Sequence, residues 1–410
     1  MSDDLGISSV DLEARVGAVG RRLSTAIRQL IDAVPGGPHR PQDLARKLSI
    51  NKDLSSRVLN ASRNRDPIAV AHLMPGPGPL RQLLRGAAKK NVDGSLVRAA
   101  EEAVDAFDEL IQNEAGDRLS LDGMISAWLP EAREKSMLLA KQAVFKGMAH
   151  IRGIHADVEL NTAMLHPSDN GKALDGVWLL GWHGLRRMRP GATVHLRTGR
   201  VGETPDSAER EILPDETPIG HCGFLLDKFC TSPVPEIQVS THATAALYTV
   251  GGDAIGSRSA VDLFFAEITR RCLPRFGDPT NPRKRGPSSQ ITTPIKMMIF
   301  DVLLHEDVFP GSEPTLSTHH TSPRGVVDVN DPFRYCDRLE MIERVDALGE
   351  GPARFRAADL PEYIEMLGDI GARMNWDLSK FRGYRCRVEY PVYGSQITLA
   401  FDLPNPPSPA

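Results

Sequence analysis

The chain has few aromatic residues and few cysteines. Phenylalanine, tryptophan and tyrosine together make up 6% of its 410 residues, and only five cysteines occur. All five lie in the C-terminal half, and no two form a CxxC pair, so the sequence does not support a zinc ribbon or a thioredoxin-like redox site. We expect free thiols in a reducing compartment. The cysteines are Cys222, Cys230, Cys272, Cys336 and Cys386.

Long apolar runs are also missing. No window contains 18 consecutive apolar residues, and residues 1–20 have neither a basic segment nor an apolar segment of the kind found in secretory signals. These absences predict a cytoplasmic protein without a membrane partner.

Catalytic motifs are missing too. The sequence contains no GxGxxG, GxxxxGK[ST], GxSxG or HExxH pattern. The glycine-rich stretch at residues 248–259 lacks a nucleotide-binding lysine and reads as a turn, while the pairs His221-Cys222 and His319-His320 have no partners at a recognisable spacing. We therefore predict no catalytic residue, no cofactor and no metal, although residues 151–410 yield little to motif analysis.

A chain of this length, 41% hydrophobic, has enough apolar material for two or three domains. Its 35 glycines and 31 prolines, with the low aromatic content, predict many turns and a β-rich portion.

The most informative stretch is residues 41–63, PQDLARKLSINKDLSSRVLNASR. Leu44, Ala45 and Leu48 share one helical face. In the next segment, a second helical face is shared by Leu54, Val58 and Ala61. Asn51 or Asp53 can cap the start of the second segment. The pattern predicts two short helices joined by a tight turn. Before this stretch, we expect a helix at residues 22–33 and frayed residues at 1–20.

The charge distribution is uneven in a way that agrees with this interpretation. Residues 21–66 contain ten Lys and Arg against four Asp and no Glu, a balance of +6. Since the whole chain carries −4, the remainder carries −10. A basic segment attached to an acidic body is typical of a module that binds phosphates.

The spacing of residues 41–63 resembles the helix-turn-helix of bacterial transcriptional regulators. The resemblance covers about 45 of the 410 residues, with Ser49 where glycine is usual at the turn and Ser55 where an apolar residue is common. It implies that the second helix enters the DNA major groove. The residues expected to face base edges are Lys52, Ser55, Ser56 and Asn60, and those expected to meet phosphates are Arg46, Lys47, Arg57 and Arg63.

Two longer amphipathic helices are expected at residues 96–111 and 131–150, with a shorter one at 119–129 between them. Long helices after a DNA-binding segment commonly form a dimer interface, so a homodimer is expected. The alternative is that both apolar stripes, including Met137, Ala140, Val144 and Met148 in the second helix, pack within one monomer.

From residue 151 the apolar period changes to that of strands. Strands are expected at residues 155–161, 176–180, 192–196, 236–240, 245–250, 296–304, 385–390 and 396–401, and helices at 259–272, 336–347 and 360–368. The predicted fold class is α+β: a helix-turn-helix-like domain at 1–66, a helical linker or dimerisation region at 67–150, and a β-rich α+β body at 151–410. A division of the body is expected near 199–218.

These observations favour a DNA-binding transcriptional regulator whose body senses a small-molecule effector or mediates assembly. The partners expected are double-stranded DNA and a second copy of the chain. The alternative is an interaction or assembly protein, or an unrecognised enzyme, that uses the helix-turn-helix-like segment to contact protein.

Overall fold

The computed structural model describes residues 9–37, 39–200, 209–211, 218–219, 223–242, 245–322 and 324–407. The chain divides into two compact units, Met1–Met137 and Leu138–Ala410. The pair His221-Cys222 and most of the division expected at residues 199–218 lie outside the described residues.

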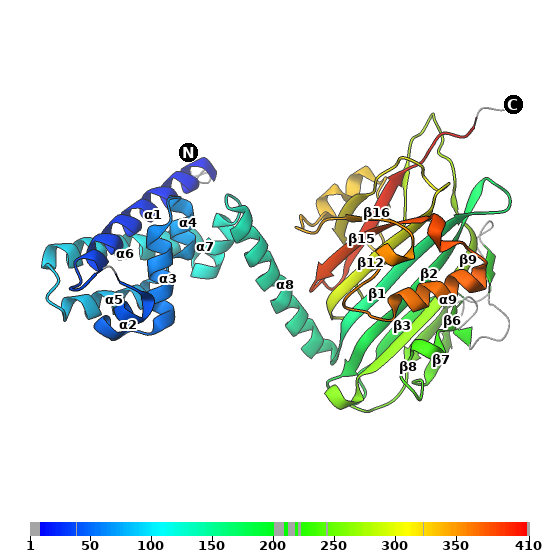
Figure 1. Ribbon diagram of the computed structural model, residues 1–410, viewed down its shortest axis with the longest axis horizontal. Coiled ribbons are helices and arrows are strands. Elements are labelled where there is room, and N and C mark those ends of the chain that lie inside the picture. The colour runs from blue at the N-terminus through cyan, green and yellow to red at the C-terminus, as the bar shows by residue number, and fades with distance from the viewer. Residues whose placement is uncertain are drawn as a thin grey trace, which may run out of the picture. The chain divides into compact units, whose positions relative to one another are not determined.

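The described part of the first unit is helical (Figure 1). Its first helix begins well before residue 22, because Leu12, Val16 and Val19 extend the apolar period of the following turns and pack into the same core. The expectation of frayed residues was therefore wrong for 9–20. The elements are α1 (Ser9–Asp32), α2 (Pro41–Leu48), α3 (Lys52–Arg63), α4 (Pro67–Leu73), α5 (Pro77–Ala88), α6 (Gly94–Leu110), a π-helical turn (Ile111–Ala115) and α7 (Arg118–Ile125).

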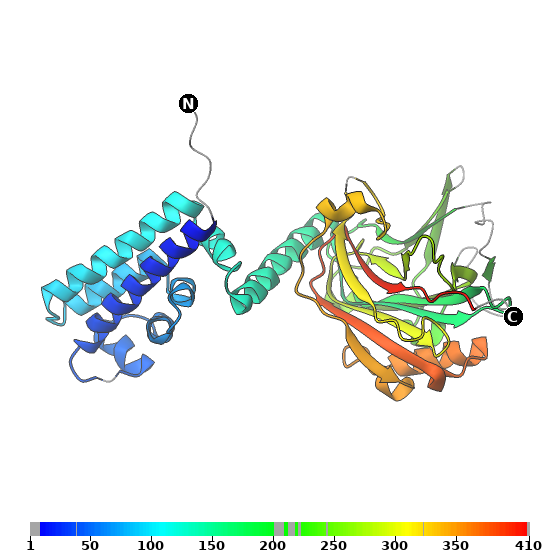
Figure 2. The same ribbon diagram turned by 90° about the horizontal axis from the view of Figure 1, so that it is seen from above.

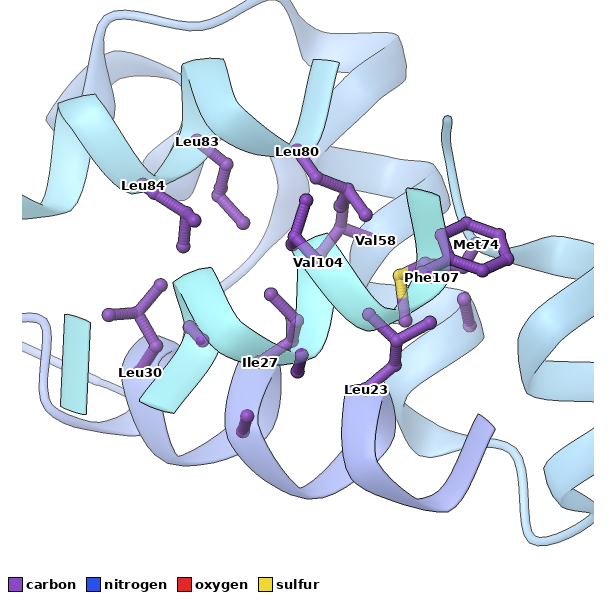
Figure 3. Close-up of a cluster of buried hydrophobic side chains, with 14 of the residues drawn as sticks. Leu23, Ile27, Leu30, Val58, Met74, Leu80, Leu83, Leu84, Val104 and Phe107 are labelled. Atoms are coloured by element: carbon purple, nitrogen blue, oxygen red, sulfur yellow. The ribbon is translucent and has the colours of Figure 1, made fainter. Parts of the chain in front are cut away.

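One hydrophobic core joins these helices. Figure 3 shows Leu23 and Ile27 of α1, Val58 of α3, Leu80 of α5 and Phe107 of α6 pointing toward a common centre, and Val58 and Phe107 are fully buried. The boundary expected between residues 66 and 67 is thus not a domain boundary, since α4 to α7 complete the core of α1 to α3.

The apolar stripe of α6 is used inside this unit. Ala100, Val104 and Phe107 are fully buried, and α6 packs against α1 and α5. This agrees with the alternative of packing within one monomer for that helix. The homodimer stays a prediction.

Helix α8 (Pro130–Arg152) crosses the boundary between the two units, which lies between Met137 and Leu138. Its C-terminal part does not bury the expected stripe, because Ala140 and Val144 are exposed. Lys141 is buried instead, in an ion pair with Glu343, and Phe145 packs its ring against His155 and Tyr390.

The second unit is built on a large sheet. Nine of the described strands form it, in the order β14-β15-β12-β1-β2-β9-β6-β5, with β4 also paired to β9. Strands β1 and β12 are parallel, and the other pairs are antiparallel. The bounds are β1 (Ile154–Pro167), β2 (Ala173–Arg187), β4 (Glu209–Glu211), β5 (Pro218–Ile219), β6 (Gly223–Leu225), β9 (Val261–Pro274), β12 (Ile295–His305), β14 (Asp346–Glu350) and β15 (Phe381–Glu389).

Different layers cover the two faces of this sheet (Figure 2). Helix α9 (Tyr363–Met374) packs on one face, where Ile299 and Leu303 of β12 meet Tyr363 and Met366. On the other face, Phe300 and its neighbours meet two smaller sheets. Their strands are β10 (Lys284–Arg285), β11 (Ser288–Gln290), β13 (Thr315–His320) and β16 (Ser395–Asp402) in one, and β3 (Val194–Arg200), β7 (Ile237–His242) and β8 (Ala245–Val250) in the other.

The chain is therefore an α+β protein, with N-terminal helices and a sheet-rich C-terminal part, as predicted. The strands expected at residues 155–161 and 296–304 are the cores of β1 and β12, and the helix expected at 360–368 overlaps α9. The helix expected at 259–272 is wrong, because that segment is β9. The helix expected at 336–347 is also wrong, since it covers only the end of a 3₁₀ helix (Pro332–Asp337) and the start of β14.

A buried ion pair fastens α9 to the sheet. Asp301 of β12 is fully buried and accepts hydrogen bonds from Arg385 Nε and Nη2 of β15, at 2.8 and 2.7 Å. The Tyr363 hydroxyl of α9 donates to the same carboxylate at 2.8 Å and lies 2.8 Å from the Thr162 hydroxyl of β1. Three strands and the helix thus meet at one charge pair.

Strand β1 also carries titratable side chains on its opposite face. Burial raises the pKa of Glu159 to about 7, and Trp182 Nε1 donates a hydrogen bond to its carboxylate at 2.9 Å. Four residues earlier, burial and then the charges of Arg186 and Lys296 lower the pKa of His155 to about 4. Both groups therefore favour their neutral forms in the folded protein.

Candidate nucleic-acid interface

Helices α2 and α3 are joined by a tight turn that starts at Ser49. Ser49 has φ 54° and ψ 42°, in the left-handed region, and its N–H bonds to the Ala45 carbonyl at the end of α2. The Asn51 side chain then accepts a hydrogen bond of 2.6 Å from the Leu54 N–H and caps α3. The turn thus has the backbone that glycine usually provides at this position, here adopted by serine.

Helix α3 is amphipathic. Its inward face packs against α1, α2 and α4, with Leu54 and Val58 in the core. The outward face is polar, and its residues recur at the three- and four-residue intervals of a helical stripe. The exposed residues of α3 are Lys52, Asp53, Ser56, Arg57, Asn60 and Arg63.

Three of the four residues predicted to face base edges lie on this outward stripe. Lys52 is the first residue of α3, Ser56 is one turn further, and Asn60 is one turn beyond that. The fourth prediction, Ser55, is wrong: its side chain is fully buried, and its hydroxyl donates a hydrogen bond of 2.8 Å to the Pro41 carbonyl. Ser55 therefore holds α3 against the start of α2. Its position, where an apolar residue is common in the resembling family, was the sequence signal for burial.

The four cations predicted to meet phosphates are placed differently from one another. Arg57 and Arg63 are exposed on α3. Arg46 of α2 is largely exposed and forms an ion pair of 2.8 Å with Asp43. Lys47 instead donates hydrogen bonds to the carbonyls of Pro35 and Gly36, at 2.6 and 3.1 Å, so it holds the loop between α1 and α2.

The C-terminal end of α3 borders a small basic pocket that the sequence did not reveal. Its volume is about 300 Å³, and its lining includes Arg28 and Asp32 of α1, His39 of the loop and Arg63. Arg28 donates a hydrogen bond of 2.6 Å to the Ser62 carbonyl, which ties α1 to the last turn of α3. Two guanidinium groups 35 residues apart in sequence therefore lie at the same end of the outward stripe.

Comparisons with protein-family models, with curated proteins and with solved structures found no match to this chain. Within the described residues, none of the helices combines the length and the apolar character needed to cross a bilayer.

Proposed function

We propose that the chain is a DNA-binding protein of the transcriptional-regulator type, in which the outward face of α3 reads duplex DNA. The observation that carries this proposal is the stripe of Lys52, Ser56, Arg57, Asn60 and Arg63, exposed on a capped helix that a tight turn joins to α2. A recognition helix needs such a face, because only exposed side chains reach the base edges in the major groove.

The distribution of roles follows the geometry. Lys52 and Ser56 occupy the first turns of α3, the part of a recognition helix that approaches base edges most closely. Arg46 on α2 and Arg63 at the end of α3 flank that region and meet the phosphates on either side. The pocket of Arg28 and Arg63 adds a further phosphate position.

The C-terminal unit takes the sensing or assembly role. Residues 21–66 carry +6 and the rest of the chain carries −10, so attraction to a polyanion is concentrated in that segment of the first unit. Binding as a homodimer, with one outward face per half-site, completes the proposal.

Fluorescence anisotropy of the full chain with a labelled random duplex, measured at about 50 and 200 mM salt, tests this function. Each phosphate neutralised adds nearly one to the slope of log K against log salt, so three to four contacts lower the affinity by roughly 100-fold over this range. Lys52→Glu with Arg57→Glu should remove most of the binding at low salt.

Lys89→Glu with Lys90→Glu is the matched control. Both lysines are exposed and follow α5, outside α2 and α3, and this pair of substitutions changes the charge by the same amount. The control should retain binding, and circular dichroism should show both proteins folded. If the Lys52 and Arg57 variant binds as tightly as the wild type, or the wild type binds no duplex at low salt, the proposal is wrong.

A further inference from the structure

The first unit contains a second pocket, of about 510 Å³, between α4 and the start of α8. Two segments far apart in sequence form its described lining: residues 64–73, from the end of α3 along α4, and residues 129–135, at the start of α8. Its volume is that of a site for a small organic molecule. The exposed residues on the outward stripe of α3 do not belong to this lining, so the pocket is separate from the proposed DNA-reading face.

Apolar side chains form one part of the lining. Leu73 of α4 and Leu129 before α8 pack against the core of the first unit and are only partly buried. Ala69 of α4 and Ala132 of α8 also line the pocket, and their small side chains leave room for a ligand. Such a wall binds an aliphatic group by removing it from water.

The His72 ring forms a fixed part of the wall. Its Nδ1 lies 3.0 Å from Asp122 Oδ1, and Arg118 pairs with the same carboxylate at 2.9 Å. A ring held in this way gives the pocket a defined shape before any ligand arrives, which lowers the cost of binding.

The turn between α3 and α4 brings one donor and one acceptor to the pocket. Asn64 Oδ1 accepts a hydrogen bond of 2.9 Å from the Asp66 N–H, and Asp66 Oδ1 accepts one of 2.9 Å from the Ile68 N–H, which caps α4. Each side chain is thus held by one of its two polar atoms. The Asn64 Nδ2 group and Asp66 Oδ2 have no hydrogen bond within the part of the chain that the structure describes.

The first turns of α8 bring a carboxylate and an ammonium to the pocket. Glu131 and Lys135 are four residues apart and both line it, so they lie one turn apart on the same face of the helix. This order and spacing favour an ion pair between the two side chains. Among the described residues, however, neither side chain has an ion pair or a hydrogen bond. Two opposite charges one helical turn apart match a ligand that itself carries both charges.

We propose that this pocket binds a free α-amino acid with an aliphatic side chain. The ammonium group of the ligand lies between the carboxylates of Asp66 and Glu131. Its carboxylate meets Lys135 and the Asn64 amide, and its side chain lies on the apolar wall. Each carboxylate and the ammonium of the described lining then faces an opposite charge, whereas a simple amine would meet the like charge of Lys135 and a simple carboxylate those of Asp66 and Glu131.

Isothermal titration calorimetry of the full chain tests the site with L-leucine and three related compounds. Isoamylamine lacks the carboxylate of leucine, 4-methylpentanoate lacks its ammonium, and glycine lacks its side chain. We expect saturable binding of L-leucine with a dissociation constant on the order of 1 mM, and binding of the other compounds at least about tenfold weaker.

Three results would overturn the proposal. Leucine that does not bind up to about 50 mM would refute the site. Isoamylamine or 4-methylpentanoate that binds as tightly as leucine would show that one charge of the ligand is not recognised. Glycine that binds as tightly as leucine would show that the apolar wall is not used. The measurement needs no DNA, so its failure leaves the DNA-binding proposal unaffected, and the reverse is also true.

Glu131→Gln and Glu134→Gln form a matched pair of variants. Both glutamates are exposed at the start of α8 and both substitutions remove one negative charge, but only Glu131 belongs to the described lining. Glu131→Gln should raise the dissociation constant of leucine about tenfold, and Glu134→Gln should leave it within about twofold. Equal effects of the two substitutions would contradict a site at this pocket.

Lys135→Gln tests the other charge. It should raise the dissociation constant of leucine about tenfold, because the ligand carboxylate loses its partner. It should lower that of isoamylamine about threefold, because a like charge beside the amine is removed. Circular dichroism should show the variant folded, since Lys135 is exposed. Leucine binding that is unchanged in this variant would overturn the assignment.

Discussion

Gly86 of α5 lies directly against the backbone of Leu48 in α2. A Cβ atom at Gly86 would stand 2.5 Å from the Leu48 carbonyl oxygen, closer than side-chain carbons come to backbone oxygens. Leu48 is the last residue of α2 and immediately precedes the turn at Ser49. The contact therefore fixes where the helix-turn-helix segment sits on the rest of the first unit.

Gly86→Ala and Gly123→Ala should change stability in opposite directions. Alanine at Gly86 forces α2 and α5 apart, which should lower the free energy of unfolding by about 1–3 kcal/mol. A Cβ atom at Gly123 of α7 would have nothing within 4 Å, so alanine there should raise the same free energy by about 0.5–1 kcal/mol through helix propensity. Urea unfolding followed by circular dichroism at 222 nm measures both. Equal effects would mean that the two helices are not in close contact.

Ser55→Ala and Ser56→Ala should separate stability from DNA binding. Ser55 is buried and bonded to Pro41, so its loss should cost about 1 kcal/mol of stability. Ser56 is exposed, so its loss should leave stability within about 0.5 kcal/mol and weaken DNA binding. Thermal unfolding and duplex anisotropy on both proteins decide the matter. A specific loss of DNA affinity in a fully stable Ser55 variant would instead support a base-contacting role for Ser55.

Asp301→Ala should be strongly destabilising and Asp359→Ala should not. Both carboxylates pair with an arginine of β15, but Asp301 is fully buried while the Arg387–Asp359 pair is partly exposed. Removing Asp301 leaves the Arg385 charge without its partner, at a cost of about 3–5 kcal/mol. The Asp359 substitution should cost less than about 1 kcal/mol. Denaturant unfolding of the two variants measures both free energies. Similar losses of stability would show that the buried pair contributes no more than the exposed one.

The pH dependence of stability should reveal two opposing groups on β1. The folded pKa of Glu159, about 7, lies above its usual 4.5. The neutral carboxyl therefore contributes at most about 3 kcal/mol to the free energy of unfolding. This contribution is complete below about pH 4.5 and is lost as the pH rises through 7. The folded pKa of His155, about 4, lies below its usual 6.5, so its stabilisation is complete above about pH 6.5 and is lost as the pH falls toward 4.

Single variants should therefore tilt the profile in opposite senses. Relative to the wild type, Glu159→Gln should gain stability as the pH rises from 4.5 to 7. His155→Gln should lose stability relative to the wild type as the pH rises from 4 to 6.5. Urea midpoints at four pH values between 4.5 and 7.5 measure the differences. Profiles parallel to that of the wild type would place both groups in water-like surroundings.

The sequence predicted those helices and strands whose apolar residues repeat regularly over a short segment. The helices around Leu48 and Val58 and the strands around Leu160 and Ile299 all have a regular apolar repeat that also occurs in the structure. The turn at Ser49 was predicted from the polar residues around it, although the segment lacks a glycine. In the structure, Asn51 caps the helix that follows this turn.

The errors occurred where distant residues decide the outcome. Residues 261–274 contain a run of apolar side chains that is compatible with a helix, yet Phe264 and Phe265 are buried on opposite faces of a strand between β2 and β6. Ser55 looked exposed because its partner, Pro41, lies 14 residues away across the turn. The pocket between α4 and the start of α8 is formed by residues 64–73 and 129–135, and no local signal brings such distant segments together.

The parallel pairing of β1 with β12 affects how the protein is made. Strand β1 ends at Pro167 and β12 begins at Ile295, so during synthesis one side of β1 lacks its final neighbour until more than 120 further residues have left the ribosome. Most of β1 is buried in the finished sheet, and an apolar edge left open for that long is prone to aggregation. The C-terminal unit therefore depends on late-synthesised strands, and its folding should be slower than that of the first unit, whose helices can pack as soon as they emerge.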